Sequence, residues 1–199
     1  MEFYNTIAQE AQAEFKDRGS RFIAYAFPIS NTDDVKKHLT ALKKEHSKAV
    51  HHTFAYRIGL DGNQFRSNDD GEPSGTAGKP ILGQIDSKQV TNTCIVVVRY
   101  FGGTLLGVPG LINAYKTAAS LVLQVVPVVQ KPIMSRFSIQ FDYTQMNDIM
   151  LIVKQLNGIV LRQEQQLFSS MDVEVPMRRS DEWKYKINNL RNVHFVDLL

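Results

Sequence analysis

The densest group of side chains that could do chemistry lies in residues 68–80, where Asp69, Asp70 and Glu72 place three carboxylates within four residues. Hydroxyls, three glycines and a lysine follow within the same segment. Carboxylates at this density can act as acid–base groups, or hold a divalent cation that binds an anionic substrate. We call residues 68–80 the acidic segment and treat it as the first candidate for a functional site.

The end of the acidic segment is similar to a phosphate-binding loop, but its spacing excludes one. Such a loop needs a glycine, four residues and then Gly-Lys-Ser/Thr, whereas Pro73 stands at the glycine position and Pro80 at the hydroxyl position. Backbone N–H groups of residues 76–79, at the start of a helix, could still hold a phosphate or carboxylate. The alternative is a rigid turn whose carboxylates are solvated or cap neighbouring groups. The candidate anion- or partner-binding residues here are Asp69, Asp70, Glu72, Ser74, Gly75, Thr76, Gly78 and Lys79.

A second glycine-containing segment, residues 102–110, lies between an apolar strand and a helix. Its glycines do not match the dinucleotide fingerprint G-x-G-x-x-G, and they are equally consistent with a sharp turn and close helix packing. Arg99 ends the preceding run of four aliphatic residues, so it either pairs with the acidic segment or faces a ligand. The candidate binding residues added by this region and by one earlier strand are Gly102, Gly103, Gly107, Gly110, Arg99 and Arg57.

Nucleophiles and bases are few. Ser74 is the one candidate nucleophile, and no base stands beside it in the sequence. His51 and His52 are adjacent on a predicted strand, so their side chains should point to opposite faces and one of them could face the acidic segment as a base. The catalytic candidates are therefore Asp70, Glu72, Ser74 and His52, without a readable triad. No metal site and no cofactor are predicted.

The elements that position these residues fall into two predicted domains, 1–134 and 135–199. In the first, we expect strands at 3–7, 21–27, 53–58 and 90–100, and helices at 32–46, 80–85 and 111–123, with a long loop at 59–78. In the second, period-2 and helical patterns alternate as strand 137–141, helix 144–156, strands 159–165 and 168–175, a helix capped by Ser180, and a strand from Val193. This βαββαβ order is typical of a ferredoxin-like domain.

The composition of the chain sets further limits. With 199 residues, 43% apolar and 22% charged, it is an ordinary globular sequence, and no apolar stretch approaches the ~20 residues of a membrane span. The first residues lack the order of a secretory signal, which predicts a cytoplasmic protein. Residues 1–134 hold 15 Lys+Arg and 12 Asp+Glu and so carry the whole net charge of +3, far from the dense basic surface of a dedicated nucleic-acid binder.

Two segments closely resemble the YigZ/IMPACT family. They are Asn-Asp-Asp-Gly-Glu-Pro-Ser-Gly-Thr-Ala-Gly-Lys-Pro at 68–80 and Val-Val-Arg-Tyr-Phe-Gly-Gly-Thr-Leu-Leu-Gly at 97–107. Weaker matches lie at 20–24 and 49–57, so the resemblance covers most of residues 14–120. Pro109 stands where the family usually has glycine, and Asn113 where a basic residue is common.

The resemblance implies a fold and a setting. It implies an α+β protein with an N-terminal β-α sandwich like the second domain of a small-subunit ribosomal protein. It also implies a C-terminal ferredoxin-like domain resembling the last domain of elongation factor G. Eukaryotic relatives are linked to translational control through a regulator of an initiation-factor kinase, and no settled reaction comes with the family.

Three interpretations remain open at this point. The first is a non-enzymatic translation-associated regulator that binds RNA, the ribosome or a protein partner through the face carrying Arg57, Lys79 and Arg99. The second is a hydrolase-like enzyme for a small anionic or phosphorylated substrate, using the carboxylates of the acidic segment. The third treats these carboxylates as an internal lock that accepts backbone N–H groups and pairs with Arg99 and Lys79.

Overall fold

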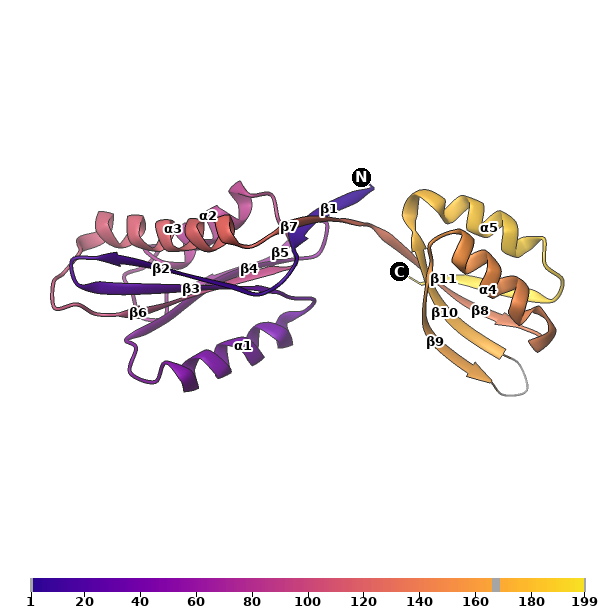
Figure 1. Ribbon diagram of the computed structural model, residues 1–199, viewed down its shortest axis with the longest axis horizontal. Coiled ribbons are helices and arrows are strands. Elements are labelled where there is room, and N and C mark those ends of the chain that lie inside the picture. Colours follow the sequence, from indigo (N-terminus) through magenta and orange to yellow (C-terminus); the bar gives the residue numbers. More distant parts are fainter. Residues whose placement is uncertain (1, 166–168, 199) are drawn as a thin grey trace. The chain divides into compact units, whose positions relative to one another are not determined.

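The computed structural model describes residues 2–165 and 169–198 and divides into two units (Figure 1). One unit is Tyr4–Lys131, and the other is Pro132–Leu199 with Met1–Phe3. Each has a hydrophobic core of its own within the described residues. The candidate residues of both motif segments fall in the unit Tyr4–Lys131.

The unit Tyr4–Lys131 is built on an antiparallel five-stranded sheet of order β2-β3-β6-β4-β5. Its strands are β2 (Ala11–Asp17), β3 (Ser20–Pro28), β4 (His51–Ile58), β5 (Gln64–Asn68) and β6 (Thr93–Tyr100). β6 lies at the centre, and its residues 93–99 are buried on both faces. A strand covered on both faces has no reason to alternate polar and apolar residues, which explains its continuous aliphatic run.

Helices cover both faces of this sheet (Figure 1). α2 (Gly78–Ser87) and α3 (Gly107–Val125) pack with Ile95 and Val97 in one core. α1 (Thr32–Glu45) packs on the other side, with Val96 and Val98. Alternate residues of β6 therefore point to different helices, so Arg99 faces the side of α2 and α3.

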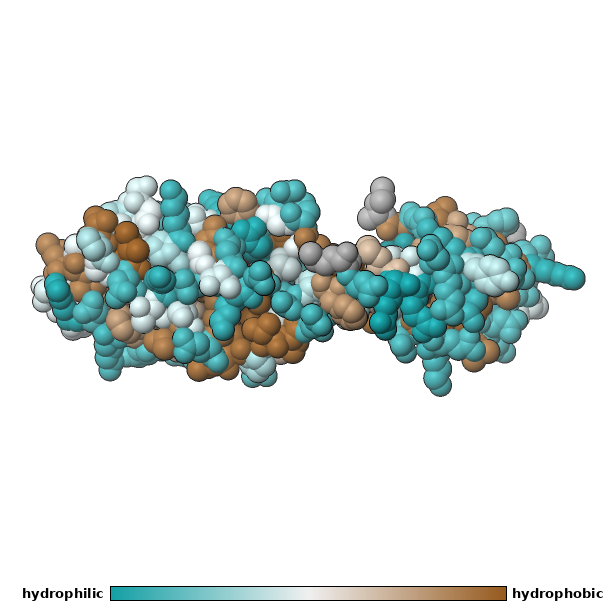
Figure 2. Space-filling view, turned by 90° about the horizontal axis from the view of Figure 1, so that it is seen from above, coloured by the Kyte–Doolittle hydropathy of each residue, from teal (hydrophilic) through white to brown (hydrophobic). Residues whose placement is uncertain are grey.

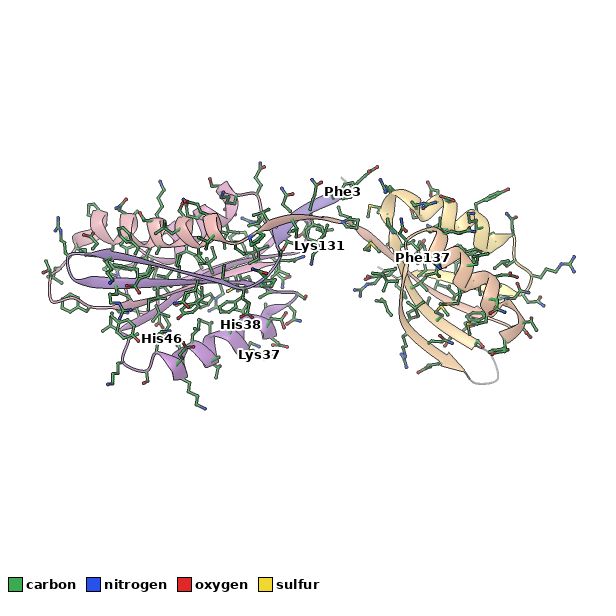
Figure 3. All side chains as sticks on the ribbon, viewed as in Figure 1. Phe3, Lys37, His38, His46, Lys131 and Phe137 are labelled. Atoms are coloured by element: carbon green, nitrogen blue, oxygen red, sulfur yellow. The ribbon has the colours of Figure 1, made fainter. Side chains whose placement is uncertain are left out.

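α1 begins where the sequence predicted. The side chain of Asn31 accepts hydrogen bonds from the first turn, and the Asp34 carboxylate accepts from the backbone N–H of Asn31, which forms a capping box. His38 and His46 lie between α1 and the sheet (Figure 3). Both ring nitrogens of His46 are hydrogen-bonded, one to the hydroxyl of Tyr25 and one to that of Tyr100.

Two strands interrupt stretches for which no strand was predicted. β2 has the weakly apolar sequence Ala-Gln-Ala-Glu-Phe-Lys-Asp, and β5 lies inside the segment 59–78 that was predicted to be loop. Both are edge strands with one neighbour each. An edge strand needs little apolar surface, because tertiary pairing rather than burial holds it. α3 also starts four residues earlier than expected, at Gly107.

A short two-stranded sheet pairs β1 (Phe3–Ile7) with β7 (Val128–Pro132). The strand at 3–7 was predicted, whereas β7 was not. Ala8 also donates a backbone hydrogen bond to the carbonyl of Pro127. This pairing brings together two stretches from opposite ends of the first predicted domain.

The C-terminal unit has the predicted βαββαβ order. Its sheet has the antiparallel order β11-β8-β10-β9. The strands are β8 (Met134–Phe141), β9 (Ile159–Gln165), β10 (Ser169–Pro176) and β11 (Val193–Leu198), and the helices are α4 (Met146–Gln155) and α5 (Ser180–Asn188), each preceded by a 3-10 turn, Tyr143–Gln145 and Met177–Arg179. The mixed α+β class is confirmed.

The two helices of this unit share one core with one face of the sheet. Phe137, Ile139 and Val173 point into it together with Trp183 of α5. The opposite sheet face carries polar side chains such as Gln140, as the alternation predicted. Two details differ from the prediction: Arg179 rather than Ser180 occupies the N-cap of α5, and the predicted strand start at 168 lies outside the described residues.

Candidate functional site

Asp69 binds the backbone of residues further along the acidic segment. Its carboxylate accepts hydrogen bonds from the backbone N–H groups of Gly75 (2.8 Å), Ala77 (3.1 Å) and Gly78 (2.8 Å). Burial acts to raise the pKa of Asp69, but these donors outweigh it and hold the pKa below its usual value. The expectation of free N–H groups at the start of α2 is therefore wrong at Ala77 and Gly78, because a carboxylate of the chain itself occupies them.

Asp70 attaches the acidic segment to β4. Its carboxylate accepts a hydrogen bond from the backbone N–H of His52 (2.6 Å), and its carbonyl oxygen lies 2.7 Å from Nδ1 of His51. Lys43 of α1 lies 3.7 Å from the same carboxylate. Since a carbonyl oxygen can only accept, a neutral His51 carries its proton on Nδ1 and keeps the lone pair of Nε2.

Glu72 is a buried carboxylate with three neighbours. Its Oε1 accepts hydrogen bonds from Nη1 of Arg99 (2.6 Å) and from the hydroxyl of Tyr115 (2.6 Å). Nε2 of His51 lies 3.8 Å from the same oxygen. Burial, together with the hydrogen bond to Glu72, raises the pKa of Tyr115 far above its usual value, so the hydroxyl stays protonated and donates. One oxygen atom thereby joins the acidic segment to both β6 and α3.

The guanidinium of Arg99 lies close to two aromatic rings. Its central carbon is 5.4 Å from the ring centre of Phe22 and 5.7 Å from that of Phe101. The side chain is only 7% exposed. Its one side-chain hydrogen bond within the described residues goes to Glu72, and its Nε is a buried donor without an acceptor there. Because a guanidinium carries five N–H bonds, Arg99 has donors beyond the one that Glu72 accepts.

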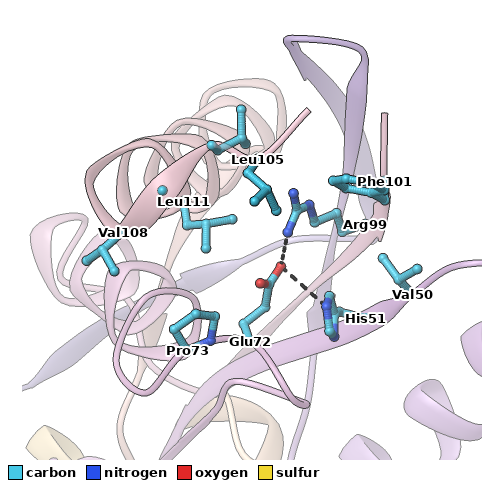
Figure 4. Close-up of a pocket in the computed structure, with 11 residues that line it drawn as sticks. Val50, His51, Glu72, Pro73, Arg99, Phe101, Leu105, Val108 and Leu111 are labelled. Atoms are coloured by element: carbon cyan, nitrogen blue, oxygen red, sulfur yellow. Dashed lines mark hydrogen bonds and ion pairs between the residues drawn. The ribbon is translucent and has the colours of Figure 1, made fainter. Parts of the chain in front are cut away.

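These polar groups form the floor of a cleft of about 420 Å³, which we call the Glu72 cleft (Figure 4). The floor consists of His51, Glu72 and Arg99. The walls consist of Val50, Pro73, Phe101, Leu105, Leu106, Gly107, Val108 and Leu111. The rim is exposed as well as apolar: Leu105 is 83% and Val108 51% accessible to solvent. Apolar walls around a few convergent polar groups are typical of binding pockets.

The space-filling view of the unit Tyr4–Lys131 also shows exposed hydrophobic residues. Hydrophobic residues gather at its left-hand end in Figure 2, the end at which the connection from β6 to α3 lies in Figure 1. The acidic segment and residues 102–110 thus meet in one hollow. Their shared surface is more apolar than the anion-receiving surface that the glycines and lysine predicted.

Arg57 does not belong to this surface. In the antiparallel pairing of β4 with β6, His51 lies opposite Arg99 but Arg57 lies opposite Thr93, at the other end of the strand. Its guanidinium bonds the Asp86 carboxylate (2.8 Å from Nε) and stacks on the ring of Phe65. Arg57 and Arg99 therefore lie on the same face of the sheet but at opposite ends of the β4–β6 pair, so Arg57 does not line the hollow that contains Arg99.

The remaining candidates of the acidic segment have separate positions. Ser74 is exposed, whereas Thr76 is buried and donates its hydroxyl to the carbonyl of Pro73 (2.7 Å). Lys79 is exposed, and within the described residues it makes no ion pair with the carboxylates of the segment. Of the two cations that the internal-lock interpretation invoked, Arg99 pairs with a carboxylate of the segment, whereas Lys79 makes no such pair in the described part of the chain.

The glycines of residues 102–110 shape the connection between β6 and α3. A Cβ on Gly102 would lie 1.9 Å from the carbonyl carbon of Gly19, so only glycine fits against the turn between β2 and β3. Gly103 and Gly107 have φ of +86° and +71°, the left-handed region that glycine favours. At Gly110 a Cβ would lie 3.0 Å from Leu106. These glycines position the cleft wall through their backbone geometry.

The four catalytic candidates do not converge. His52 lies on the α1 side of β4, where burial lowers its pKa against the opposing charge of Asp70. Asp70 and Glu72 have different partners, and Ser74 has neither as a hydrogen-bond partner among the described residues. No group of three or more His, Cys, Asp and Glu in that part of the chain is placed to hold a metal ion.

Comparisons of the sequence and of the structure with known proteins identify the family of this chain. The sequence model of the Impact N-terminal domain matches residues 18–123. The chain is 33% identical over 170 residues to "IMPACT family member YigZ" of Escherichia coli (strain K12), covering 84% of this chain and 83% of that protein. It is 38% identical over 146 residues to "IMPACT family member YvyE" of Bacillus subtilis (strain 168), covering 73% and 67%. The chain belongs to the IMPACT family.

A solved structure carries the likeness over the whole chain. It is described as the crystal structure of a hypothetical protein, is 29% identical, and superposes with a TM-score of 0.82 over 100% of this chain and 98% of that one. The family resemblance noted from the two motifs is therefore confirmed. Among the described residues, no helix of this IMPACT-family chain is both long and apolar enough to cross a membrane.

All residues of the Glu72 cleft lie inside the matched IMPACT region, between residues 50 and 111. Sequence reasoning missed part of it. His51 rather than His52 faces the cleft, which the inward alternation of Thr53 and Ala55 along β4 would have indicated. Tyr115 and the exposed wall residue Leu105 were not among the candidate site residues, because an aromatic in a helix and a leucine in a loop are both common; the one signal for Leu105 was its place in the second family motif.

Proposed function

We propose that this IMPACT-family protein is a non-enzymatic, translation-associated regulator that docks a protein partner in the Glu72 cleft. The observation that carries the proposal is the exposed apolar rim around a floor whose two charges neutralise each other. Exposed apolar surface of this kind is typical of interaction sites. The translation setting rests on the family, whose eukaryotic members the resemblance links to translational control.

A protein partner fits this surface better than RNA does. RNA binding depends on many Lys and Arg side chains that neutralise phosphates. Residues 1–134 exceed neutrality by only three charges, and the one cation in the cleft, Arg99, is paired with Glu72. An apolar rim would leave the phosphate backbone without partners.

A hydrolase-like reaction has weaker support. A general base or nucleophile must be free to meet the substrate. The Asp69 carboxylate accepts three backbone N–H groups, and one oxygen of Glu72 accepts from both Arg99 and Tyr115. These interactions match the internal lock, which holds the acidic segment in place and is compatible with partner binding.

The test is a cell-free translation system reconstituted from purified components. We expect the full chain to change the yield of a reporter protein, and Leu105→Asp to abolish the effect because a charge on the rim prevents apolar docking. Leu60→Asp is the matched control, since Leu60 is an exposed leucine (44%) outside the cleft. Equal effects of both variants, or no effect of the wild-type chain, would overturn the proposal.

The same preparation distinguishes RNA from protein as the partner. Binding to ribosomal RNA or tRNA that falls steeply with salt, and that Leu105→Asp leaves unchanged, would contradict docking in the Glu72 cleft. Binding to a protein component that persists at moderate salt and is lost with Leu105→Asp would support it.

A further inference from the structure

We infer that the Glu72 cleft recognises a neutral main-chain carbonyl next to an aliphatic side chain of the partner, and not an anionic group. The inference rests on the proposed function, for which it names the chemistry of the docked segment. Three features of the cleft lead to it: its charge balance, its unused hydrogen-bonding groups and its apolar walls.

The charge balance disfavours an anion. Glu72 and Arg99 form an ion pair at 2.6 Å, with side chains only 3% and 7% exposed, so the floor has no net charge while His51 is neutral. A carboxylate or phosphate reaching Arg99 would share that cation with Glu72. Two anions on one cation in a buried site repel each other, whereas a neutral carbonyl adds no charge.

The hydrogen-bonding groups of Arg99 and His51 that have no partner in the described part of the chain favour a carbonyl oxygen as ligand. Nη1 of Arg99 donates to Glu72, and Nε is a buried donor that has no acceptor within the described residues. Buried donors are normally satisfied, and this guanidinium lines an open cleft. Nε2 of His51 offers a lone pair on the same floor, because Nδ1 is used by the Asp70 carbonyl. A donor and an acceptor side by side complement the C=O and N–H of a peptide unit.

The walls supply the place for a side chain. Phe101 on one side and Leu105, Val108 and Leu111 on the other surround the Glu72–Arg99 pair (Figure 4). An aliphatic group entering between them would remove apolar surface from water at about 25 cal/mol per Å². The volume of about 420 Å³ is at the lower end of typical ligand pockets, which suits one residue and its peptide units.

Three small probes distinguish recognition of a neutral group from recognition of an anionic one. N-acetyl-leucine N-methylamide offers an aliphatic side chain between two neutral peptide units. N-acetyl-leucine keeps that side chain but ends in a carboxylate, and inorganic phosphate tests an anion alone. Each is titrated into the full-length, isotope-labelled chain at neutral pH, and the Arg99 Nε–H and the methyl signals of Leu105 and Leu111 are followed by NMR.

We expect the methylamide to cause saturable shifts of these signals, and we expect N-acetyl-leucine to bind more weakly by a factor of about ten or more. In Leu105→Ser the Arg99 Nε–H and Leu111 methyl signals should no longer shift, and this variant should fold because Leu105 is 83% exposed; Leu60→Ser should keep the shifts. Tighter or equal binding of N-acetyl-leucine, shifts of Arg99 with phosphate, or no shift with the methylamide would overturn the inference. If it fails while Leu105→Asp still abolishes the translation effect, the docking function stands and only the recognised chemistry is wrong.

Discussion

At the scale of single residues, the ion pair between Glu72 and Arg99 stabilises the fold only as a pair. Arg99→Ala would leave a carboxylate buried without its cation, and removing one partner of a buried pair typically costs about 3–5 kcal/mol of the free energy of unfolding. The double variant Glu72→Met/Arg99→Met should recover much of that loss, because it leaves no unpaired charge. Urea unfolding of the full chain measures both effects.

The matched control is Arg21→Ala. Arg21 makes a bidentate pair with Glu14 on the same sheet, but its side chain is 48% exposed. Water and salt screen such a pair, so its loss should have a small effect. Equal destabilisation by Arg99→Ala and Arg21→Ala would contradict the buried lock.

Asp69 should give the fold a measurable acid sensitivity. Its pKa is lower in the folded chain than in the unfolded chain, where it is about 3.9. The carboxylate therefore stabilises the fold above that pH, and this contribution disappears as the pH falls through the folded pKa. We expect Asp69→Asn to destabilise the chain most near pH 7 and progressively less below about pH 4.

Unfolding curves over that pH range test this prediction, with Glu10→Gln as the control. Glu10 is exposed, so its variant should follow the wild-type pH profile. A constant difference between Asp69→Asn and the wild type at all pH values would show that the carboxylate charge does not matter to the three backbone donors.

The sequence predicted the chemistry of these residues better than their geometry. The pairing of Arg99 with a carboxylate of the acidic segment was one of the two alternatives that a charged residue at the end of a buried strand left open. The structure places His51, and not His52, in the Glu72 cleft, and it places Arg57 at the other end of β4 from Arg99. Both depend on which face and which end of a strand a residue occupies, and register is set by pairing with distant strands.

At the scale of elements, the connection between β6 and α3 depends on Gly102. Gly102→Ala would place a methyl group 1.9 Å from the carbonyl carbon of Gly19 and 2.2 Å from the backbone nitrogen of Ser20. Backbone atoms cannot yield like the end of a side chain, so we expect a loss of about 1–3 kcal/mol or more in thermal or urea unfolding.

Gly83→Ala in α2 is the control for this substitution. Nothing lies within 4 Å of its added Cβ, and alanine is the better helix former by about 0.5–1 kcal/mol. It should be neutral or stabilising. A Gly102→Ala variant as stable as the wild type would mean that the turn between β2 and β3 can move away from the cleft.

The elements that the sequence predicted well are those that bury apolar surface. β6 and the alternating strand β8 carry clear hydrophobic patterns, and α1 carries a capping box with acidic residues in its first turn. The elements that were missed, β2, β5 and β7, each pair with a single neighbouring strand. Their existence depends on a neighbour that supplies half of the hydrogen bonds, which no local pattern records.

At the scale of the whole molecule, the two units should respond separately to core mutations. The chain has one tryptophan, Trp183, which is buried in the C-terminal unit. Ile139→Ala in that core should lower the midpoint of the fluorescence transition, at a cost of about 2–5 kcal/mol. Ile95→Ala, in the core of Tyr4–Lys131, should leave the fluorescence transition in place and shift only the remaining change in circular dichroism.

A single coincident transition that both variants shift equally would contradict independent cores.

The α+β class and the βαββαβ order could be predicted, because each C-terminal element has a periodic pattern and a clear end. The order of strands in the five-stranded sheet could not, since it brings β3, β4 and β6 together across long stretches of chain.

The oxygen Oε1 of Glu72 has a further consequence for genetics. It joins the acidic segment to the strands β4 and β6 and to the helix α3, so we expect mutations of these residues also to lower the amount of folded protein. The phenotype of a variant at Glu72, Arg99 or Tyr115 would then not distinguish the loss of folded protein from the loss of its function. Because Leu105 is 83% exposed, we expect substitutions there to leave the amount of folded chain unchanged, so that their phenotypes report on the biological role.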